Sequence, residues 1–129
     1  SSHSGAAFKA PYSASKAGLV NLTKSVAFAL TRDNIKVNGL NLGWTHTPGE
    51  EKTMEKYVTK DKDWPTTHGK DLPWGRLIQP LEAAKAIAFM TSSESGLMTG
   101  SIIDFDQIIS GWYADYAGPK KLKDNELGI

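Results

Sequence analysis

Apolar residues recur at intervals of three and four positions early in the chain, between Tyr12 and Leu30. This spacing predicts an amphipathic helix, and Pro11 precedes it at a place where a missing amide hydrogen costs little. The expected buried face comprises Leu19, Leu22, Thr23, Val26, Ala27 and Leu30. After a polar break, residues 35–42 are partly β-branched and are followed by Gly43, which predicts a strand. A helix, a tight turn and a strand in this order form half of a βαβ unit.

The segment from residue 45 to about residue 75 is polar and punctuated by Trp and Pro. We expect it to be irregular, with one weakly amphipathic piece over about residues 51–58. Met54, Tyr57 and Val58 would form the apolar side of that piece. A connection of this length in a compact domain is usually functional.

A second helix is predicted to begin at Pro80. Its expected inward face comprises Leu81, Ala84, Ile87, Ala88 and Thr91. A final strand is predicted over Ser101–Phe105, after the turn at Gly100. The tail, about residues 112–129, has no periodicity and is expected to be loosely held.

Helices and strands therefore alternate, which is typical of an α/β domain with a parallel sheet. The 129 residues correspond to about one domain. Only two strands are predicted, whereas a parallel sheet needs several strands and cover on both faces. We therefore expect the fold to continue outside this sequence.

Composition narrows the class of protein further. The chain carries 15 Lys and Arg and 14 Asp and Glu, without the concentrated basic face that a nucleic-acid partner needs. It contains no cysteine, so disulfides and thiolate metal sites are excluded, and a cytoplasmic location is expected. No apolar run approaches the roughly 18 residues of a membrane span. The first residues lack both Met and the features of a signal peptide, so we expect part of a longer or processed polypeptide.

Tyr12 and Lys16 are the residues on which chemistry would depend. They are four positions apart, so on a helix the phenol and the ammonium lie on one face, a turn apart. A free phenol has a pKa of about 10 and is a poor base near neutral pH. A nearby cation favours the phenolate, and a phenol tuned in this way exchanges a proton with an alcohol or carbonyl oxygen. The spacing alone favours a solvated helix face, so the surrounding sequence has to decide.

Further motifs follow in a fixed order. Residues 12–19 read YSASKAGL, residues 35–43 read IKVNGLNLG, and residues 45–47 read THT. Later landmarks are GRL at 75–77, PLE at 80–82, TG at 99–100 and the strand end at 104–107. Together these motifs resemble the short-chain dehydrogenase/reductase family, from the first residues to about residue 111. The resemblance implies that residues 1–129 are a single domain, the second half of a doubly wound, Rossmann-type parallel-sheet fold.

The resemblance also implies an activity, namely reversible hydride transfer between NAD or NADP and an alcohol/carbonyl pair. Tyr12 would donate or accept the proton on oxygen, while Lys16 would hydrogen-bond the nicotinamide ribose and favour the phenolate. The substrate would be a small alcohol, ketone or polyol. A homo-oligomer, often a tetramer, is implied, with the first helix and the last strand at its interfaces.

The nicotinamide side of the site would be formed by residues after the first strand. By resemblance these are Leu42, Gly43, Trp44, Thr45 and Thr47. The backbone of Thr45 and the hydroxyl of Thr47 would meet the carboxamide. Leu42 stands where the family usually has Pro, and Thr45 where it usually has a β-branched aliphatic residue. The Thr keeps the branch, and a backbone contact needs no particular side chain.

Two parts of the family's site are missing from this sequence. The catalytic serine usually precedes the tyrosine by a longer interval than Ser1, Ser2 or Ser4 does, so we expect it upstream of Ser1. Ser2 on a shortened loop is the alternative. The glycine-rich phosphate-binding turn is absent as well. We therefore expect this chain to be inactive alone, and the alternatives are a non-catalytic fragment or a regulatory protein that binds dinucleotide without turnover.

The remaining candidates each have a structural alternative. His46 lies between two nicotinamide-contacting threonines and would face either substrate or solvent. Asp104 and Asp106 would hold a cation or, more commonly, be solvated. Trp64 and Trp74 lie in the family's substrate-lid region, where they would line a pocket or pack in the lid. The three histidines lack metal-ligand spacing, so no metal is expected.

Overall fold

The computed structural model describes residues 9–109. In chain order these form α1 (Ala10–Leu30), the 3-10 turn η2 (Thr31–Asp33), β1 (Gly39–Leu42), α2 (Pro48–Tyr57), α3 (Trp64–Gly69), α4 (Pro80–Thr91), the 3-10 turn η3 (Ser93–Ser95) and β2 (Ile102–Phe105). Ser1, Ser2, Ser4 and the predicted loose tail lie outside the described residues, so the expectations about them stay predictions.

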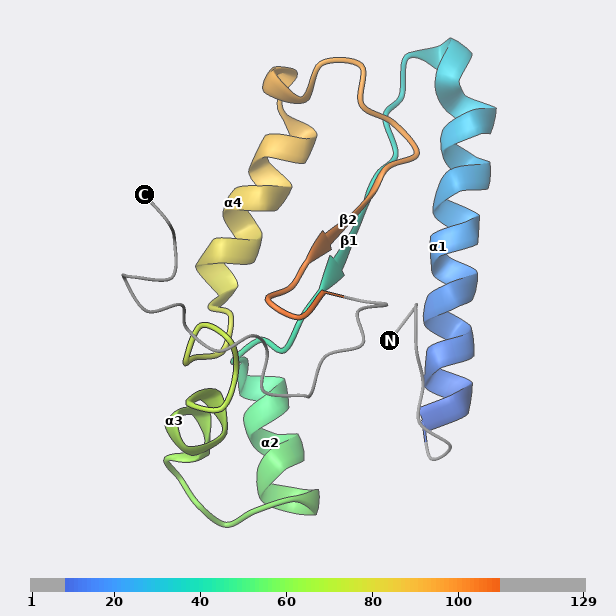
Figure 1. Cartoon of the computed structure of the whole chain (residues 1–129). Coiled ribbons are helices and arrows are strands. Elements are labelled where there is room, and N and C mark those ends of the chain that lie inside the picture. Colours follow the sequence, from blue (N-terminus) through green and yellow to red (C-terminus); the bar gives the residue numbers. More distant parts are fainter. Residues whose placement is uncertain (1–8, 110–129) are drawn as a thin grey trace, which may run out of the picture.

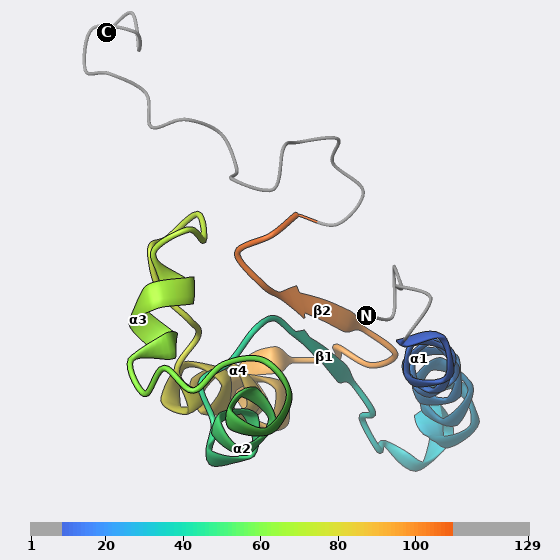
Figure 2. The same cartoon turned by 90° about the horizontal axis from the view of Figure 1, so that it is seen from below.

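β1 and β2 pair in parallel, with Gly39 opposite Ile102 and Leu42 opposite Phe105. This pairing confirms the predicted α/β class with a parallel sheet. The helix α1 lies on one side of the strands, and α2, α3 and α4 lie on the other (Figure 1, Figure 2). Because the strands are parallel, Leu42 and Phe105 end side by side. The carboxyl ends of parallel strands are where α/β sheets usually bind ligands.

The first strand is shorter than predicted, because it begins at Gly39 and not at Ile35. In the preceding residues side-chain contacts add to a backbone bond from the amide of Gly100 to the carbonyl of Val37 (2.8 Å). Asn38 donates through Nδ2 to the carbonyl of Met98 (2.9 Å) and accepts at Oδ1 from the amide of Ser101 (3.1 Å). These bonds set the register before the backbone ladder begins.

α1 agrees with its predicted range, but the prediction of its buried face is partly wrong. Ala27 is buried, and Thr23, Val26 and Leu30 are half-buried. Leu19 and Leu22 are exposed over more than half of their surface, because the described elements leave that part of the face uncovered. The apolar stripe is thus real, although two of its six residues, Leu19 and Leu22, lack a covering partner among residues 9–109.

The segment predicted to be irregular contains two helices, α2 and α3. The Thr47 hydroxyl caps α2 by accepting from the amide of Glu50 (3.1 Å). Met54 and Trp64 pack with Leu77 in a buried cluster, flanked by Trp44 and Leu72. The aromatic and aliphatic residues that break the periodicity of this segment therefore form a small core of their own.

Two predicted inward faces need correction. In α2 only Met54 is buried, whereas Tyr57 and Val58 are exposed. In α4 the buried residues are Ala83 and Met90. The residues predicted to point inward from α4 are exposed, namely Leu81, Ala84, Ile87, Ala88 and Thr91. Because α4 is apolar over most of its surface, periodicity could not choose among its stripes.

Candidate functional site

Tyr12 and Lys16 lie one turn apart near the start of α1. The Lys16 Nζ is 5.3 Å from the centroid of the Tyr12 ring, which is within the range of a cation–π contact. Tyr12 is 52% exposed. The prediction that phenol and ammonium share one helix face is confirmed, and the phenol is open to a bound molecule.

A cavity of about 230 Å³ separates this part of α1 from β1. Tyr12 and Lys16 line it on the helix side, and Leu42 lines it at the carboxyl end of the strand. The remaining lining residues are Leu19, Val20, Thr23, Gly39, Leu40, Asn41 and Ile102. The structure thus joins three of the predicted site residues around one space, although they come from two elements.

Gly43 follows Leu42 at a crowded point. Its amide donates to the carbonyl of Phe105 (2.9 Å), which extends the ladder past β1. A Cβ atom at this position would lie 2.3 Å from Oδ1 of Asp106 and 2.4 Å from its Cγ. A larger residue here would have to displace that carboxylate, so Gly43 lets the end of β1 approach Asp106 closely.

The chain after Gly43 runs beside Ile78. The carbonyl of Trp44 accepts from the amide of Ile78 (3.0 Å), and the amide of His46 donates to the carbonyl of Ile78 (2.9 Å). In a parallel bridge of this kind the intervening residue, Thr45, directs its own N–H and C=O away from the partner. The Thr45 backbone is therefore oriented to bind something on the side opposite Ile78.

The side chains of Trp44 and His46 are turned toward the helices. Trp44 stacks on Trp64, with ring centroids 5.9 Å apart, and its Nε1–H donates to Glu50 (2.8 Å). His46 Nε2 lies 2.8 Å from Oε1 of Glu51, and the imidazole contacts Trp64 edge-on. Neither side chain lines the cavity beside Tyr12. They anchor the segment that carries Thr45 and Thr47.

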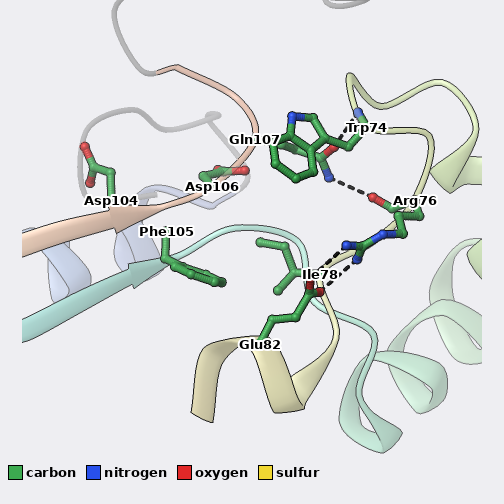
Figure 3. A pocket seen from close by; sticks show the side chains of 8 residues that line it. All are labelled: Trp74, Arg76, Ile78, Glu82, Asp104, Phe105, Asp106 and Gln107. Carbon is green, nitrogen blue, oxygen red and sulfur yellow. Dashed lines mark hydrogen bonds and ion pairs between the residues drawn. The ribbon is translucent and has the colours of Figure 1, made fainter. Parts of the chain in front are cut away.

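A second cavity, of about 190 Å³, lies at the carboxyl end of β2 (Figure 3). Ile78 and Phe105 form its apolar wall, and Trp74, 76% exposed, stands at its rim. Two roles were open for Trp64 and Trp74 from the sequence, lining a pocket or packing in the lid. Trp64 belongs to the buried cluster, whereas Trp74 lines this cavity.

Arg76 and Glu82 form the most strongly bonded ion pair of the described site, with contacts of 2.8 and 2.7 Å. Hydrogen bonds from Arg76, and then from the amide of Gln79, hold the pKa of Glu82 at about 2. The pair fastens the segment before α4 to the first turn of that helix. Both residues belong to motifs noted in the sequence, GRL at 75–77 and PLE at 80–82, but nothing in the sequence predicted the bond between them.

Two kinds of feature, a metal-binding cluster and a membrane-spanning helix, are not found among the described residues. Within residues 9–109 no group of His, Cys, Asp or Glu is arranged to hold a metal ion, and Asp104 instead accepts from Asn41 Nδ2 (2.7 Å). None of the helices in the same range is long and apolar enough to span a membrane.

Comparison with known proteins shows which family this chain belongs to. The family model described as "Enoyl-(Acyl carrier protein) reductase" matches residues 1–107. The chain is 39% identical, over 95 residues, to 3-oxoacyl-(acyl-carrier-protein) reductase FabG of Thermotoga maritima, an alignment that covers 74% of this chain and 36% of that protein. The chain spans about a third of the length of the curated relatives that it matches.

Solved structures agree with the sequence relationship. L-sorbose reductase of Gluconobacter frateurii, complexed with NADPH and L-sorbose, matches with a TM-score of 0.66 and 29% identity, over 74% of this chain and 38% of that one. A variant of actinorhodin polyketide ketoreductase with NADPH matches with a TM-score of 0.70 and 29% identity, over 81% and 41%. The matched family model, these relatives and the ordered motifs agree, so the chain belongs to the short-chain dehydrogenase/reductase family.

Proposed function

We propose that this chain forms the reaction centre of an NAD(P)-dependent oxidoreductase that interconverts an alcohol and a carbonyl compound. The observation that carries the proposal is the contact between Tyr12 and Lys16 at the wall of a cavity that reaches the carboxyl end of β1. Membership of the short-chain dehydrogenase/reductase family supports the same reaction class.

In the direction of reduction, the Tyr12 hydroxyl donates its proton to the carbonyl oxygen as the carbonyl carbon accepts hydride. In oxidation, the phenolate takes the proton from the alcohol. Lys16, whose Nζ lies 5.3 Å from the centroid of the Tyr12 ring, assists Tyr12 and hydrogen-bonds the nicotinamide ribose in this proposal. General acid–base catalysis of this kind contributes a factor of about 10² to 10⁴.

The residues after β1 fit the nicotinamide end of a dinucleotide. A nicotinamide carboxamide needs both a donor and an acceptor, and the Thr45 backbone presents both on the side away from Ile78. The Thr47 hydroxyl accepts from Glu50 and still has its own proton to donate. Bound there, the cofactor would supply the hydride. Two related structures contain NADPH, which supports this assignment.

The substrate in this proposal is a small molecule with a carbonyl or hydroxyl group, such as a ketone or polyol. A homo-oligomer is part of the same proposal. Leu19, Leu22 and Phe28 are exposed on α1, and Phe28 reaches 86% exposure, which supports a partner for that helix.

The test is Tyr12→Phe in the intact protein. NADPH consumption is followed with L-sorbose, acetoacetyl-CoA and cyclohexanone, and NADPH binding is followed by fluorescence titration. Tyr12→Phe removes one oxygen atom, so we expect turnover to fall by a factor of about 10² or more while binding of NADPH stays within about twofold of the parent.

The matched control is Tyr57→Phe. Tyr57 is also exposed and also has a lysine beside it, since Lys56 Nζ lies 4.9 Å from its ring centroid, but it lines no cavity with a strand end. Turnover should be unchanged in this variant. Equal rates for Tyr12→Phe and the parent would contradict the proposal and favour a dinucleotide-binding regulatory protein.

A further inference from the structure

Gln107 connects the end of β2 to the segment before α4. Its Oε1 accepts a hydrogen bond from the amide of Trp74 (2.9 Å), and its Nε2 donates to the carbonyl of Arg76 (2.8 Å) (Figure 3). The partners are 33 and 31 residues away in sequence. One side chain therefore makes a two-point bridge between two distant parts of the backbone.

The chemistry of the bridge requires a primary amide. A carboxamide presents an acceptor and a donor side by side, and the amide of Trp74 and the carbonyl of Arg76 need one of each. A carboxylate has the same shape but no donor, so it would face the Arg76 carbonyl with a second acceptor. An alanine would leave both backbone groups to water.

The backbone between the two partners is shaped to meet this bridge. Gly75 lies between them with φ of 69°, in the left-handed region that favours glycine, and its amide donates to the carbonyl of Leu72 (2.8 Å). On the α4 side the segment is held by the bonds between Arg76 and Glu82. On the Trp74 side the Gln107 bridge is the contact that fastens it to β2.

Trp74 depends on that bridge for its place. Its indole is mostly exposed, unlike Trp64, so core packing does not hold it. It stands at the rim of the cavity that has Ile78 and Phe105 as its apolar wall. An exposed aromatic ring at the rim of an apolar cavity contributes to ligand binding only if other contacts hold the ring in place.

The same strand end also touches the proposed reaction centre. Asp106, the neighbour of Gln107, lies against Gly43, and Gly43 follows Leu42 in the wall of the Tyr12 cavity. We propose that Gln107 is a positioning residue, which holds Trp74 as a wall of the substrate site by bridging β2 to the segment before α4. The role in substrate binding rests on the proposed oxidoreductase function.

The test compares Gln107→Ala and Gln107→Glu with the parent in the intact protein. The control is Ile108→Ala, which shortens the next side chain but leaves both bridging bonds. Two quantities are measured, hydrogen exchange at the amide of Trp74 and steady-state kinetics with whichever of L-sorbose, acetoacetyl-CoA and cyclohexanone turns over fastest.

In Gln107→Ala the Trp74 amide loses its acceptor, so its exchange should become about tenfold faster or more. In both variants the KM for the carbonyl substrate should rise by about five- to twentyfold, the range expected for one or two hydrogen bonds that hold a binding-competent segment. The kcat and the KM for NADPH should stay within about twofold, because Gln107 touches no reacting group. Ile108→Ala should behave as the parent.

Several results would overturn the assignment. These are unchanged exchange at Trp74 in Gln107→Ala, an unchanged KM in Gln107→Glu, or a fall in kcat without a change in KM. An intact protein that turns over none of the three carbonyl compounds would contradict the oxidoreductase proposal alone. The exchange measurement would then still decide whether Gln107 holds the segment.

Discussion

Replacing Gly43 by Ala puts a methyl group where the Asp106 carboxylate now lies. The new Cβ would be 2.3 Å from Oδ1, 2.4 Å from Cγ and 2.9 Å from Oδ2, so the whole carboxylate is in the way. It must retreat by about 1 Å to regain an ordinary contact of roughly 3.5 Å. The backbone cannot give way easily, because the Gly43 amide is bonded to the carbonyl of Phe105.

The cost can be estimated from these contacts. Overpacking in a closed core costs about 1–3 kcal/mol, and the lower end of that range applies here because the Asp106 carboxylate is the exposed end of a side chain. Movement of the carboxylate also weakens the bond that Asp106 Oδ1 accepts from the amide of Ile108 (3.2 Å). Alanine restricts the unfolded chain and returns about 0.4–1 kcal/mol, since Gly43 does not need a left-handed conformation. We expect a net loss of about 1–2 kcal/mol in the free energy of unfolding.

The assay is urea unfolding of the intact parent, Gly43→Ala, Asp106→Ala and the double variant. Removal of the carboxylate makes room for the new methyl group, so the double variant should be more stable than the sum of the single losses predicts, by about 1 kcal/mol or more. If the two losses instead add to within about 0.3 kcal/mol, Asp106 is not the obstacle to the new methyl group.

Two further predictions concern the framework of the site. Lys36 Nζ donates to the carbonyl of Ser92 (3.0 Å), to Ser95 Oγ (2.7 Å) and to the carbonyl of Gly96 (3.2 Å). Lys36→Met removes these three bonds, so it should lower the free energy of unfolding by about 2 kcal/mol once the side-chain entropy that Lys36 loses on folding is subtracted. A loss below about 0.5 kcal/mol in urea unfolding would contradict this. Glu82 has a folded pKa of about 2, below its ordinary value of 4.5, so its stabilising effect is present above the ordinary pKa and is lost as pH falls through the folded value. The stability difference between the parent and Glu82→Gln should therefore shrink from about pH 6 to about pH 2, and a constant difference across that range would contradict the coupling to Arg76.

The candidate site divides into local and non-local parts. The contact between Tyr12 and Lys16 follows from helical spacing, so it could be predicted from eight residues of sequence. The strand end at Leu42 and Gly43 was predictable as well, since a short β-branched run followed by glycine is a local pattern. No local pattern predicts the bridge of Gln107 to Trp74 and Arg76, which spans more than thirty residues.

Burial was the least predictable property. Leu19 and Leu22 have the spacing of a buried face, yet a periodic stripe specifies only that a partner is needed, and the described residues do not supply one there. In α4 several stripes are apolar, so the sequence leaves the rotation of the helix undetermined. In the structure the buried residues are Ala83 and Met90, and the bonds between Arg76 and Glu82 fasten the first turn of the helix.

Local sequence patterns were enough to predict the α/β class, the order of helix and strand, and the pairing of Tyr12 with Lys16, because these depend on residues within a few positions of one another. Only the tertiary structure decided that Leu42 shares a cavity with that pair, that Asp106 lies on Gly43, and that Trp74 rather than Trp64 lines a pocket. Those contacts join residues far apart in the chain, and the parallel pairing of β1 with β2 sets much of their geometry because it brings the two strand ends side by side.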